Sequence, residues 1–333
     1  MAIDIGRRQF ISVLGGAAVT WPSAAHAQQP ALPVVGFVRV GSPDASAGYV
    51  AAFRKGLNEE GYVEGQNVTV EYHWLGGGQY DQMKALVADL VRRQVAVIAT
   101  PGNTPAALTA KAATATIPIV FGTGEDPVQR GLVASLARPG GNATGINYFV
   151  DEVVAKRLRL LHDLVPTAIR VATLVDPSIP SVAASTLRGV QEAAPTLGLQ
   201  IQILNASTIG EFDAAFATLA RERPDALFVG ANAFFLERRV QFATLTARHK
   251  IPATYSSRDY VAVGGLMSYG TDLADMFHQV GVYTGKILKG EKPADLPVLQ
   301  STKFEFVINL QTARALGIEV PQNVLSITDE VIE

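Results

Sequence analysis

Short apolar runs alternate with longer amphipathic segments in the first half of the chain after residue 31. The runs have the length and composition of buried strands, and the segments between them carry apolar residues at helical spacing. The expected strands are Val34–Val38, Asn67–Tyr72, Ala96–Ala99 and Ile117–Phe121. The expected helices are Ala45–Glu60, which stops at Gly61, then Tyr80–Arg93 and Pro105–Ala115. This order predicts right-handed strand–helix–strand units in a parallel sheet covered on both faces.

The second half of the chain repeats this order. Its expected strands are Val171–Val175, Ile201–Leu204 and Ala226–Val229, followed by one that Ile251 and Pro252 lead into. Its expected helices are Ser181–Leu197, Glu211–Arg223 and Phe235–His249. Two more helices, Met276–Leu288 and Gln311–Leu316, and a strand, Lys303–Leu310, have no counterpart in the repeat. The matched order favours two similar lobes over one larger sheet.

The predicted fold class is therefore α/β, with two Rossmann-like lobes that have parallel sheets and are joined by about three hinge crossings. Thr144–Asn147 and Gly264–Gly270 are the expected crossing strands. We assign residues 32–147 and 272–295 to the first lobe, and residues 148–271 and 296–333 to the second.

The N-terminal residues have the pattern of an export signal. Arg7–Arg8 are followed by an apolar run, Phe10–Trp21, and by the small-x-small sequence Ala25–Ala27. This is typical of a signal peptide cleaved near Ala27, and the paired arginines favour the twin-arginine route. Gly6 stands where that route prefers Ser or Thr, so general secretion remains an alternative. An uncleaved anchor helix is disfavoured because the run is shorter than the ~20 residues of a bilayer span. The expected location is the periplasm.

Composition narrows the possible partners. The formal net charge of −2, with 17% charged residues, argues against nucleic acid or anionic lipid as the main partner. The chain contains no cysteine, which excludes a lipoprotein anchor, disulfides and thiolate chemistry. A chain of this length can build a sufficient apolar core without disulfide bonds.

The candidate binding residues follow the strands. Ligands of open parallel sheets bind beyond the carboxyl ends of the strands, so two facing lobes would place their loops around one cleft. The candidates from these loops and from the crossing strands are Ser42, Thr100, Asn103, Thr104, Thr123, Glu125, Asp126, Asn147, Asn232, Phe234, Tyr255, Arg258 and Ser268.

The chemistry of these candidates favours a small polar solute with an apolar part. Hydroxyl and amide side chains near helix starts, such as Asn103 and Thr104, could hold a carboxylate together with free N–H groups, or simply cap the helices. Glu125 and Asp126 could accept from an ammonium or amide, although Asp126 before Pro127 equally fits a turn. Aromatic residues such as Phe234 could form an apolar side of the cleft.

Catalytic patterns are scarce. The histidines after Ala27 are not at metal-ligand spacing, and the chain has neither a G-x-S-x-G elbow nor a phosphate-binding loop. We therefore expect no catalytic residue, no metal and no cofactor. The alternatives are an exported α/β enzyme with Glu125, Asp126 or Asp259 as general base, or a ligand-sensing protein that feeds a membrane sensor. A sugar-responsive transcription regulator would need a basic helix-turn-helix where the export signal stands.

Several stretches resemble one family. They are Gly61–Val68, Ile117–Phe121, Asp126–Val128, Arg138–Gly145, Gly264–Gly270, Ile287–Gly290 and Val307–Leu310. Taken together they resemble the ABC transporter substrate-binding proteins related to the tryptophan/tyrosine-binding type. The resemblance implies a type I periplasmic-binding-protein fold, and a monomer that delivers a small solute to an ABC permease and its ATPase subunit.

The resemblance extends only partly to the binding residues. Thr100–Pro101 and Asp126–Pro127 match segments of the family. In the second lobe, aromatic amino-acid binders of the family tend to show Pro-Thr-Asp-Asn where this chain has Gly230–Ala233, and only Asn232 offers a comparable polar group. An amino acid and a small aromatic or carboxylated compound therefore both remain open as the solute.

Overall fold

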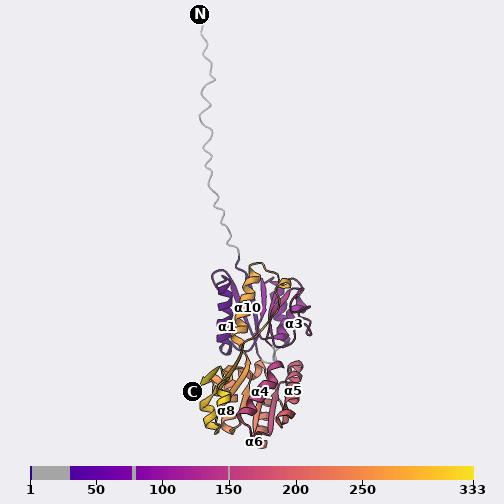
Figure 1. Ribbon diagram of the computed structural model, residues 1–333. Coiled ribbons are helices and arrows are strands. Elements are labelled where there is room, and N and C mark those ends of the chain that lie inside the picture. Colours follow the sequence, from indigo (N-terminus) through magenta and orange to yellow (C-terminus); the bar gives the residue numbers. More distant parts are fainter. Residues whose placement is uncertain (2–30, 77–79, 149–150) are drawn as a thin grey trace. The chain divides into compact units, whose positions relative to one another are not determined.

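Two β-sheets organise the part of the chain that the structure describes (Figure 1). The structure is a computed structural model and describes Met1 and residues 31–76, 80–148 and 151–333. Both sheets belong to one compact unit, Leu32–Glu333. Apart from Met1, the predicted signal peptide lies outside the described residues.

The first sheet has the strand order β11-β5-β4-β3-β1-β2, and all its neighbouring strands are parallel. Its strands are β1 (Val34–Val40), β2 (Thr69–Leu75), β3 (Val97–Thr100), β4 (Ile119–Thr123), β5 (Ala143–Asn147) and β11 (Leu299–Gln300). The accompanying helices are α1 (Ala47–Glu59), α2 (Tyr80–Arg92), α3 (Thr104–Ala113) and α10 (Leu273–Leu288), with 3-10 turns η1 (Asp44–Ser46) and η3 (Pro293–Asp295). The central strands β3 and β4 are buried at every position, as expected for a parallel sheet covered on both faces.

The second sheet has the order β13-β12-β10-β9-β8-β6-β7, and it is parallel except that β12 runs antiparallel to β10. Its strands are β6 (Arg170–Val175), β7 (Gln200–Asn205), β8 (Ala226–Val229), β9 (Ala253–Tyr255), β10 (Met267–Thr271), β12 (Phe304–Asn309) and β13 (Glu330–Ile332). Its helices are α4 (Asp151–Leu164), α5 (Pro180–Ala193), α6 (Ile209–Glu222), α7 (Ala233–Glu237), α8 (Arg239–His249), α9 (Arg258–Ala262), α11 (Leu310–Leu316) and α12 (Gln322–Leu325), with the 3-10 turn η2 (Ala194–Leu197).

The predicted α/β class with two Rossmann-like sheets is confirmed. By sheet membership the chain changes sheets three times, between β5 and β6, between β10 and β11, and between β11 and β12. One predicted boundary needs correction. Residues 296–333 were assigned to the second lobe, but Leu299 and Gln300 pair with Ile146 and Asn147 in the first sheet. The remaining lobe boundaries stay predictions.

Several elements differ from the sequence prediction. The helix α4 was not predicted, and neither were the short elements α9, α12 and β13. The helix expected over Phe235–His249 is divided at Arg238, where the backbone leaves the helical region (φ −97°, ψ 15°) and the N–H bonds to the Phe235 carbonyl. Thr144–Asn147, expected as a crossing strand, is part of β5 in the first sheet.

Helix α10 packs closely against α1, although more than 200 residues separate them in the chain (Figure 1). Glycines make this approach possible. A Cβ atom on Gly56 would lie 2.9 Å from the Val282 nitrogen and closer still to the His278 carbonyl oxygen. On the facing helix, a Cβ on Gly281 would clash with the Phe53 carbonyl. The contact brings α10 into the apolar core of the first sheet.

Candidate functional site

A cavity of about 160 Å³ lies at the carboxyl ends of strands from both sheets. This is where ligands of open parallel sheets bind. Its lining residues are Arg39, Val40, Gly102, Asn103, Thr104, Pro105, Gly124, Glu125, Tyr148, Val153, Arg157, Asp176, Ser178, Ile179, Val182, Ser207, Ala231, Asn232, Ala233, Phe234, Leu236, Ser256, Ser257, Gly270, Thr271, Leu273, Met276 and Phe277. The lining thus combines apolar side chains with a small number of charged and amide groups, as small-molecule sites do.

Five of the predicted binding residues lie on this lining: Asn103, Thr104, Glu125, Asn232 and Phe234. The Asn103 side chain caps α3, because its Oδ1 accepts from the N–H of residue 106 at 3.1 Å. Its Nδ2 is buried and has no hydrogen-bond partner among the described residues. Of the two possibilities raised by the sequence, the cap is present, and a contact between Asn103 and a solute stays a prediction.

The loop after β4 is fixed by its own polar groups. Thr123 Oγ1 lies 2.7 Å from Thr104 Oγ1 and accepts from the Glu125 N–H at 3.1 Å. The Asn147 Nδ2 donates to the Glu125 carbonyl at 3.0 Å. Asp126 accepts from two backbone N–H groups of the following turn, at 2.8 Å and 3.1 Å. Thr123, Asp126 and Asn147 therefore hold the loop that presents Glu125, and none of the three is on the lining itself.

A second polar cluster on the lining centres on Asp176, at the end of β6. Its Oδ1 accepts from the Ser178 N–H at 2.8 Å and from Ser207 Oγ at 2.7 Å. Its Oδ2 accepts from Asn232 Nδ2 at 3.0 Å. Asn232 in turn accepts from the Phe234 N–H at 2.6 Å, so the cluster orients the start of α7.

The remaining predicted residues lie off the lining. Ser42 accepts from the Ala45 N–H at 3.3 Å, and Thr100 and Ser268 are buried within their strands. Tyr255 is fully buried in the core, where it stacks on Tyr260 with ring centroids 4.5 Å apart. Arg258 pairs with Glu330 Oε1 and Oε2 at 2.7 Å and 2.6 Å. Contacts between these five residues and a solute stay predictions.

Arg39, near the end of β1, is a lining residue that the sequence analysis missed. Its side chain is 7% exposed, and its guanidinium lies 5.2 Å from the Tyr49 ring centre and 4.6 Å from that of Phe277. Burial lowers the pKa of Arg39. It has neither a hydrogen bond nor an ion pair with any of the described residues, and its Nε is enclosed.

Arg157, on α4, is the second lining residue of this kind. It is 1% exposed, and one terminal nitrogen donates to the Val229 carbonyl at 2.9 Å. The guanidinium lies 4.1 Å from the Phe228 ring centre, and burial lowers the pKa of Arg157 to about 9. Within the described part of the chain it has no acidic partner, and its Nε has no acceptor.

A sequence signal for both arginines existed. Arg39 interrupts an otherwise apolar strand whose positions are nearly all buried. Arg157 lies four residues from both Val153 and Leu161, on the apolar side of its helix. A charge on an apolar face is rare unless the charge has a partner or a role.

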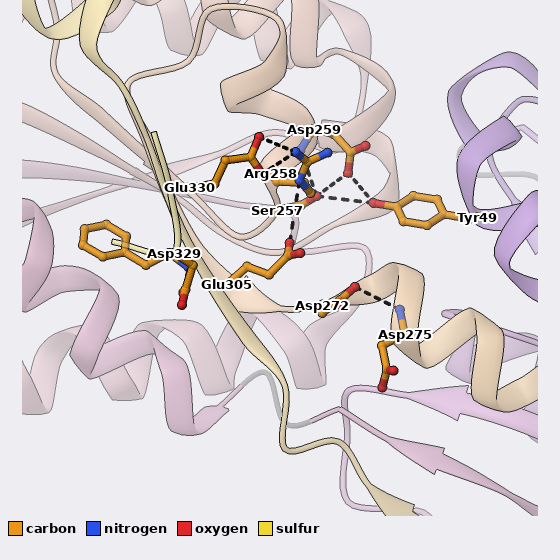
Figure 2. Close-up of polar contacts among 10 residues, drawn as sticks. Tyr49, Ser257, Arg258, Asp259, Asp272, Asp275, Glu305, Asp329 and Glu330 are labelled. Atoms are coloured by element: carbon orange, nitrogen blue, oxygen red, sulfur yellow. Dashed lines mark hydrogen bonds and ion pairs between the residues drawn. The ribbon is translucent and has the colours of Figure 1, made fainter. Parts of the chain in front are cut away.

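Close to the cavity, a tyrosine from α1 meets polar residues at the start of α9 (Figure 2). The Tyr49 hydroxyl donates to the Asp259 carboxylate and lies 3.4 Å from Ser257 Oγ. Ser257 also donates to Asp259. Burial and the Asp259 charge raise the pKa of Tyr49, so the phenol remains a donor.

Three acidic side chains lie near Glu305 of β12 in the same region: Asp259 of α9, Asp272 at the start of α10 and Glu330 of β13 (Figure 2). Burial first, and then the charge of Asp272, raises the pKa of Glu305 to about 7. The charges of Glu330 and Asp259 contribute to this rise, and Arg258, whose Nε lies 3.9 Å from Glu305 Oε2, opposes it. The charge of Glu305 therefore changes near neutral pH.

No helix among the described residues is both long and apolar enough to cross a membrane. In the same part of the chain, no three His, Asp or Glu side chains come together in a way that could hold a metal ion.

Comparison with known proteins identifies the family of this chain. Residues 34–332 match the family model described as ABC transporter substrate binding protein. The chain belongs to this family, and the prediction from the sequence is confirmed. Because the family and the relatives below are substrate-binding proteins, the prediction that the chain is not an enzyme is confirmed as well.

Individual relatives agree with this assignment. A tyrosine-binding protein of Clostridioides difficile is 26% identical over 269 residues, which cover 80% of this chain and 76% of the relative. The ABC domain of Streptococcus pneumoniae in complex with L-Trp has a TM-score of 0.79 at 25% identity, covering 90% of this chain and 100% of that one. A conserved domain protein of Vibrio cholerae has the same TM-score and identity and covers 90% and 99%. The fold is that of the type I periplasmic binding proteins.

Proposed function

We propose that this protein is the periplasmic solute-binding component of an ABC importer. In this function it captures a small solute in the cavity between the two sheets and delivers it to a membrane permease coupled to an ATPase subunit. The solute is an amino acid or a small aromatic or carboxylated compound. The observation that carries the proposal is the cavity itself, whose lining comes from both sheets and includes apolar, amide and charged side chains.

Two lines of support concern the solute. The Clostridioides difficile relative is named for tyrosine, and the Streptococcus pneumoniae domain was solved with L-Trp. Both solutes combine a carboxylate with an aromatic ring. The cavity has guanidinium groups at Arg39 and Arg157 and aromatic rings at Phe234 and Phe277, so it offers partners for both parts.

In this proposal the protein closes on its solute by a hinge motion and does not convert the solute chemically. Three passages between the sheets would let the two lobes close on the solute and open again at the permease. Export depends on residues 1–27, and we propose cleavage near Ala27 and a monomeric, periplasmic mature protein without a nucleic-acid partner. A ligand-sensing protein that feeds a membrane sensor would use the same cavity and differs only in the membrane partner.

A thermal-shift screen of the mature protein tests the binding role. The probes are L-tryptophan, L-tyrosine, L-phenylalanine, 3-phenylpropanoate, phenylacetate and, for contrast, glucose and ribose. A bound solute at 100 times its Kd adds about 2.7 kcal/mol to the free energy of unfolding. We expect at least one of the ring-bearing probes to stabilise the protein. Failure of every probe, or turnover of any of them, would contradict the proposed function.

A further inference from the structure

Arg157 is a buried cation on the cavity lining, and no anion balances it in the part of the chain that the structure describes. Its side chain is 1% exposed. Among the described residues, the group whose charge acts on it is the Tyr260 phenol, which burial keeps protonated. The pKa of Arg157 is about 9 despite its burial, so the guanidinium is charged at neutral pH. A buried charge without a counter-ion is strongly destabilising, so its presence calls for an explanation.

The hydrogen bonds of Arg157 leave most of its donors unused. A guanidinium presents several N–H donors in a fixed fork. Nη2 donates to the Val229 carbonyl at 2.9 Å, whereas Nε and Nη1 have no acceptor among the described residues. One neutral N–H would be enough to tie α4 to this carbonyl. Anchoring of the helix therefore does not explain why a whole charged guanidinium is buried here.

The guanidinium is held in place at the end of a strand. Val229 is the last residue of β8, and the Phe228 ring centre lies 4.1 Å from the guanidinium carbon. The carbonyl and the ring fix the position of the group and leave its other N–H donors to a ligand. A planar fork of this kind matches a carboxylate, whose two oxygens can accept parallel N–H bonds.

Arg39, the second guanidinium on the lining, differs from Arg157 in its surroundings. The carboxylates of Asp259 and Glu237 both act on the charge of Arg39. The protein itself therefore balances part of this charge, whereas no carboxylate acts on Arg157 in the described part of the chain. The missing anion belongs to Arg157.

The carboxylates of the lining remain available to a cationic group of the solute. Asp176 accepts hydrogen bonds from neutral donors only. Glu125 Oε2 has no hydrogen bond, although Arg130 Nε lies 3.2 Å from it. The lining therefore defines an anionic part of the solute and leaves open whether an ammonium group accompanies it.

We infer that the solute carries a carboxylate and that the Arg157 guanidinium receives it at the carboxyl end of β8. Arg157 is thus the residue that selects acids over neutral compounds of the same shape. This inference rests on the proposed function and deepens it, because it names the group of the solute that is recognised and the residue that recognises it. Amino acids and organic acids both satisfy it.

Isothermal titration calorimetry on the mature protein tests the preference for a carboxylate. The acid that stabilises the protein most in the thermal-shift screen is compared with its own amide, for example L-tyrosine with L-tyrosinamide or 3-phenylpropanoate with 3-phenylpropanamide. We expect the acid to bind more tightly by about 30-fold or more. Equal affinity of acid and amide would overturn the inference. Stabilisation by a sugar but by no acid would overturn it and leave the binding role intact, whereas failure of all probes would overturn both.

Arg157→Met gives a second readout. This variant keeps an apolar stem and loses the charge, so we expect the Kd of the acid to rise by about 30-fold and that of the amide by less than about 3-fold. The preference for the acid should therefore nearly disappear, while the Tm of the ligand-free protein stays equal or rises. A role in stability alone predicts a lower Tm with the preference intact, and that result would overturn the inference.

Two further arginine variants serve as controls. Arg159 is exposed on the same helix as Arg157, so Arg159→Met should change neither the Kd values nor the Tm. Arg39→Met should keep the preference for the acid, because carboxylates of the protein act on Arg39. Loss of the preference in Arg39→Met together with its retention in Arg157→Met would overturn the assignment to Arg157.

A lysine variant covers the case in which Arg157→Met does not fold. Arg157→Lys keeps the charge and loses the planar fork. We expect the Kd of the acid to rise by about 5-fold or more in this variant. An unchanged Kd would contradict recognition of the carboxylate by the guanidinium.

Discussion

The Tyr49 hydroxyl on α1 donates a hydrogen bond to the Asp259 carboxylate on α9, and so connects a helix of the first sheet with a helix of the second (Figure 2). The donor and acceptor are 210 residues apart in the sequence. Tyr49 is held from the other side by Phe277 of α10, whose ring stacks on it with centroids 4.9 Å apart. The contact thus depends on the same α1–α10 packing that the glycines permit.

Removal of this hydroxyl should destabilise the protein moderately. A hydrogen bond to a charged group contributes about 1.5–3 kcal/mol, and Ser257 still donates to Asp259 in its absence. We therefore expect Tyr49→Phe to lower the free energy of unfolding, measured by urea denaturation, by about 1–2 kcal/mol. Tyr269→Phe is the control, because the Tyr269 hydroxyl makes no hydrogen bond to any described residue. Equal losses of unfolding free energy in the two variants would show that the hydrogen bond between Tyr49 and Asp259 does not stabilise the protein.

Stability should depend on pH through Glu305. Its pKa is raised to about 7, above the value of about 4.3 expected for an unfolded chain. The folded state therefore binds a proton on the Glu305 carboxyl more tightly than the unfolded chain does. The contribution of this protonation to the free energy of unfolding is complete below about pH 4 and is lost as the pH rises through 7. Glu305→Gln mimics the protonated form, so this loss should be absent from the variant.

The measurement compares the free energies of unfolding of the two proteins at pH 4.5 and pH 8. We expect Glu305→Gln to be more stable than the wild type by about 1–2 kcal/mol at pH 8, less than the full shift implies because the side chain is partly exposed. At pH 4.5 the difference should nearly vanish. Glu319→Gln, at an exposed position, serves as the control and should show no difference at either pH. A pH-independent effect of Glu305→Gln would refute this assignment.

The contact between α1 and α10 predicts opposite effects for two glycines of one helix. Gly56→Ala places a methyl group against the backbone of α10, and overpacking of this kind costs about 1–3 kcal/mol or more. Gly48→Ala lies on the same helix with no atom within 4 Å of the new Cβ, so better helix propensity should raise stability by up to about 1 kcal/mol. Thermal unfolding of both variants checks this, and a stable Gly56→Ala protein would mean that the helices can separate at little cost.

The repeated strand–helix order was predictable because apolar runs and helical spacing are local. Strands such as β3 and β8 consist of buried residues throughout, and each falls within one residue of its predicted range. Helix α4 escaped prediction although its apolar side includes Val154, Leu158 and Leu161. The pattern on that side is interrupted by Arg157, the residue that faces the cavity.

The candidate site could be predicted only in part for a related reason. The loops after the strands follow from topology, and they yielded Asn103, Thr104, Glu125, Asn232 and Phe234 on the lining. The arginines come from within a strand and a helix, and their importance depends on partners far away in the sequence. Tyr255 is the last residue of β9 and Arg258 follows that strand, but tertiary packing buries the Tyr255 ring in the core and pairs Arg258 with Glu330.

The order in which the chain is made has a consequence for the first sheet. A nascent chain that ends at Asn147 contains five of its strands, but it lacks the α10 side chains Phe277 and Val280 of its core and the edge strand β11. Those parts emerge from the ribosome only when residues 273–300 have been translated. The first lobe to be started is therefore completed only after the central strands of the second have been synthesised, and truncation before Gln300 would leave neither sheet intact.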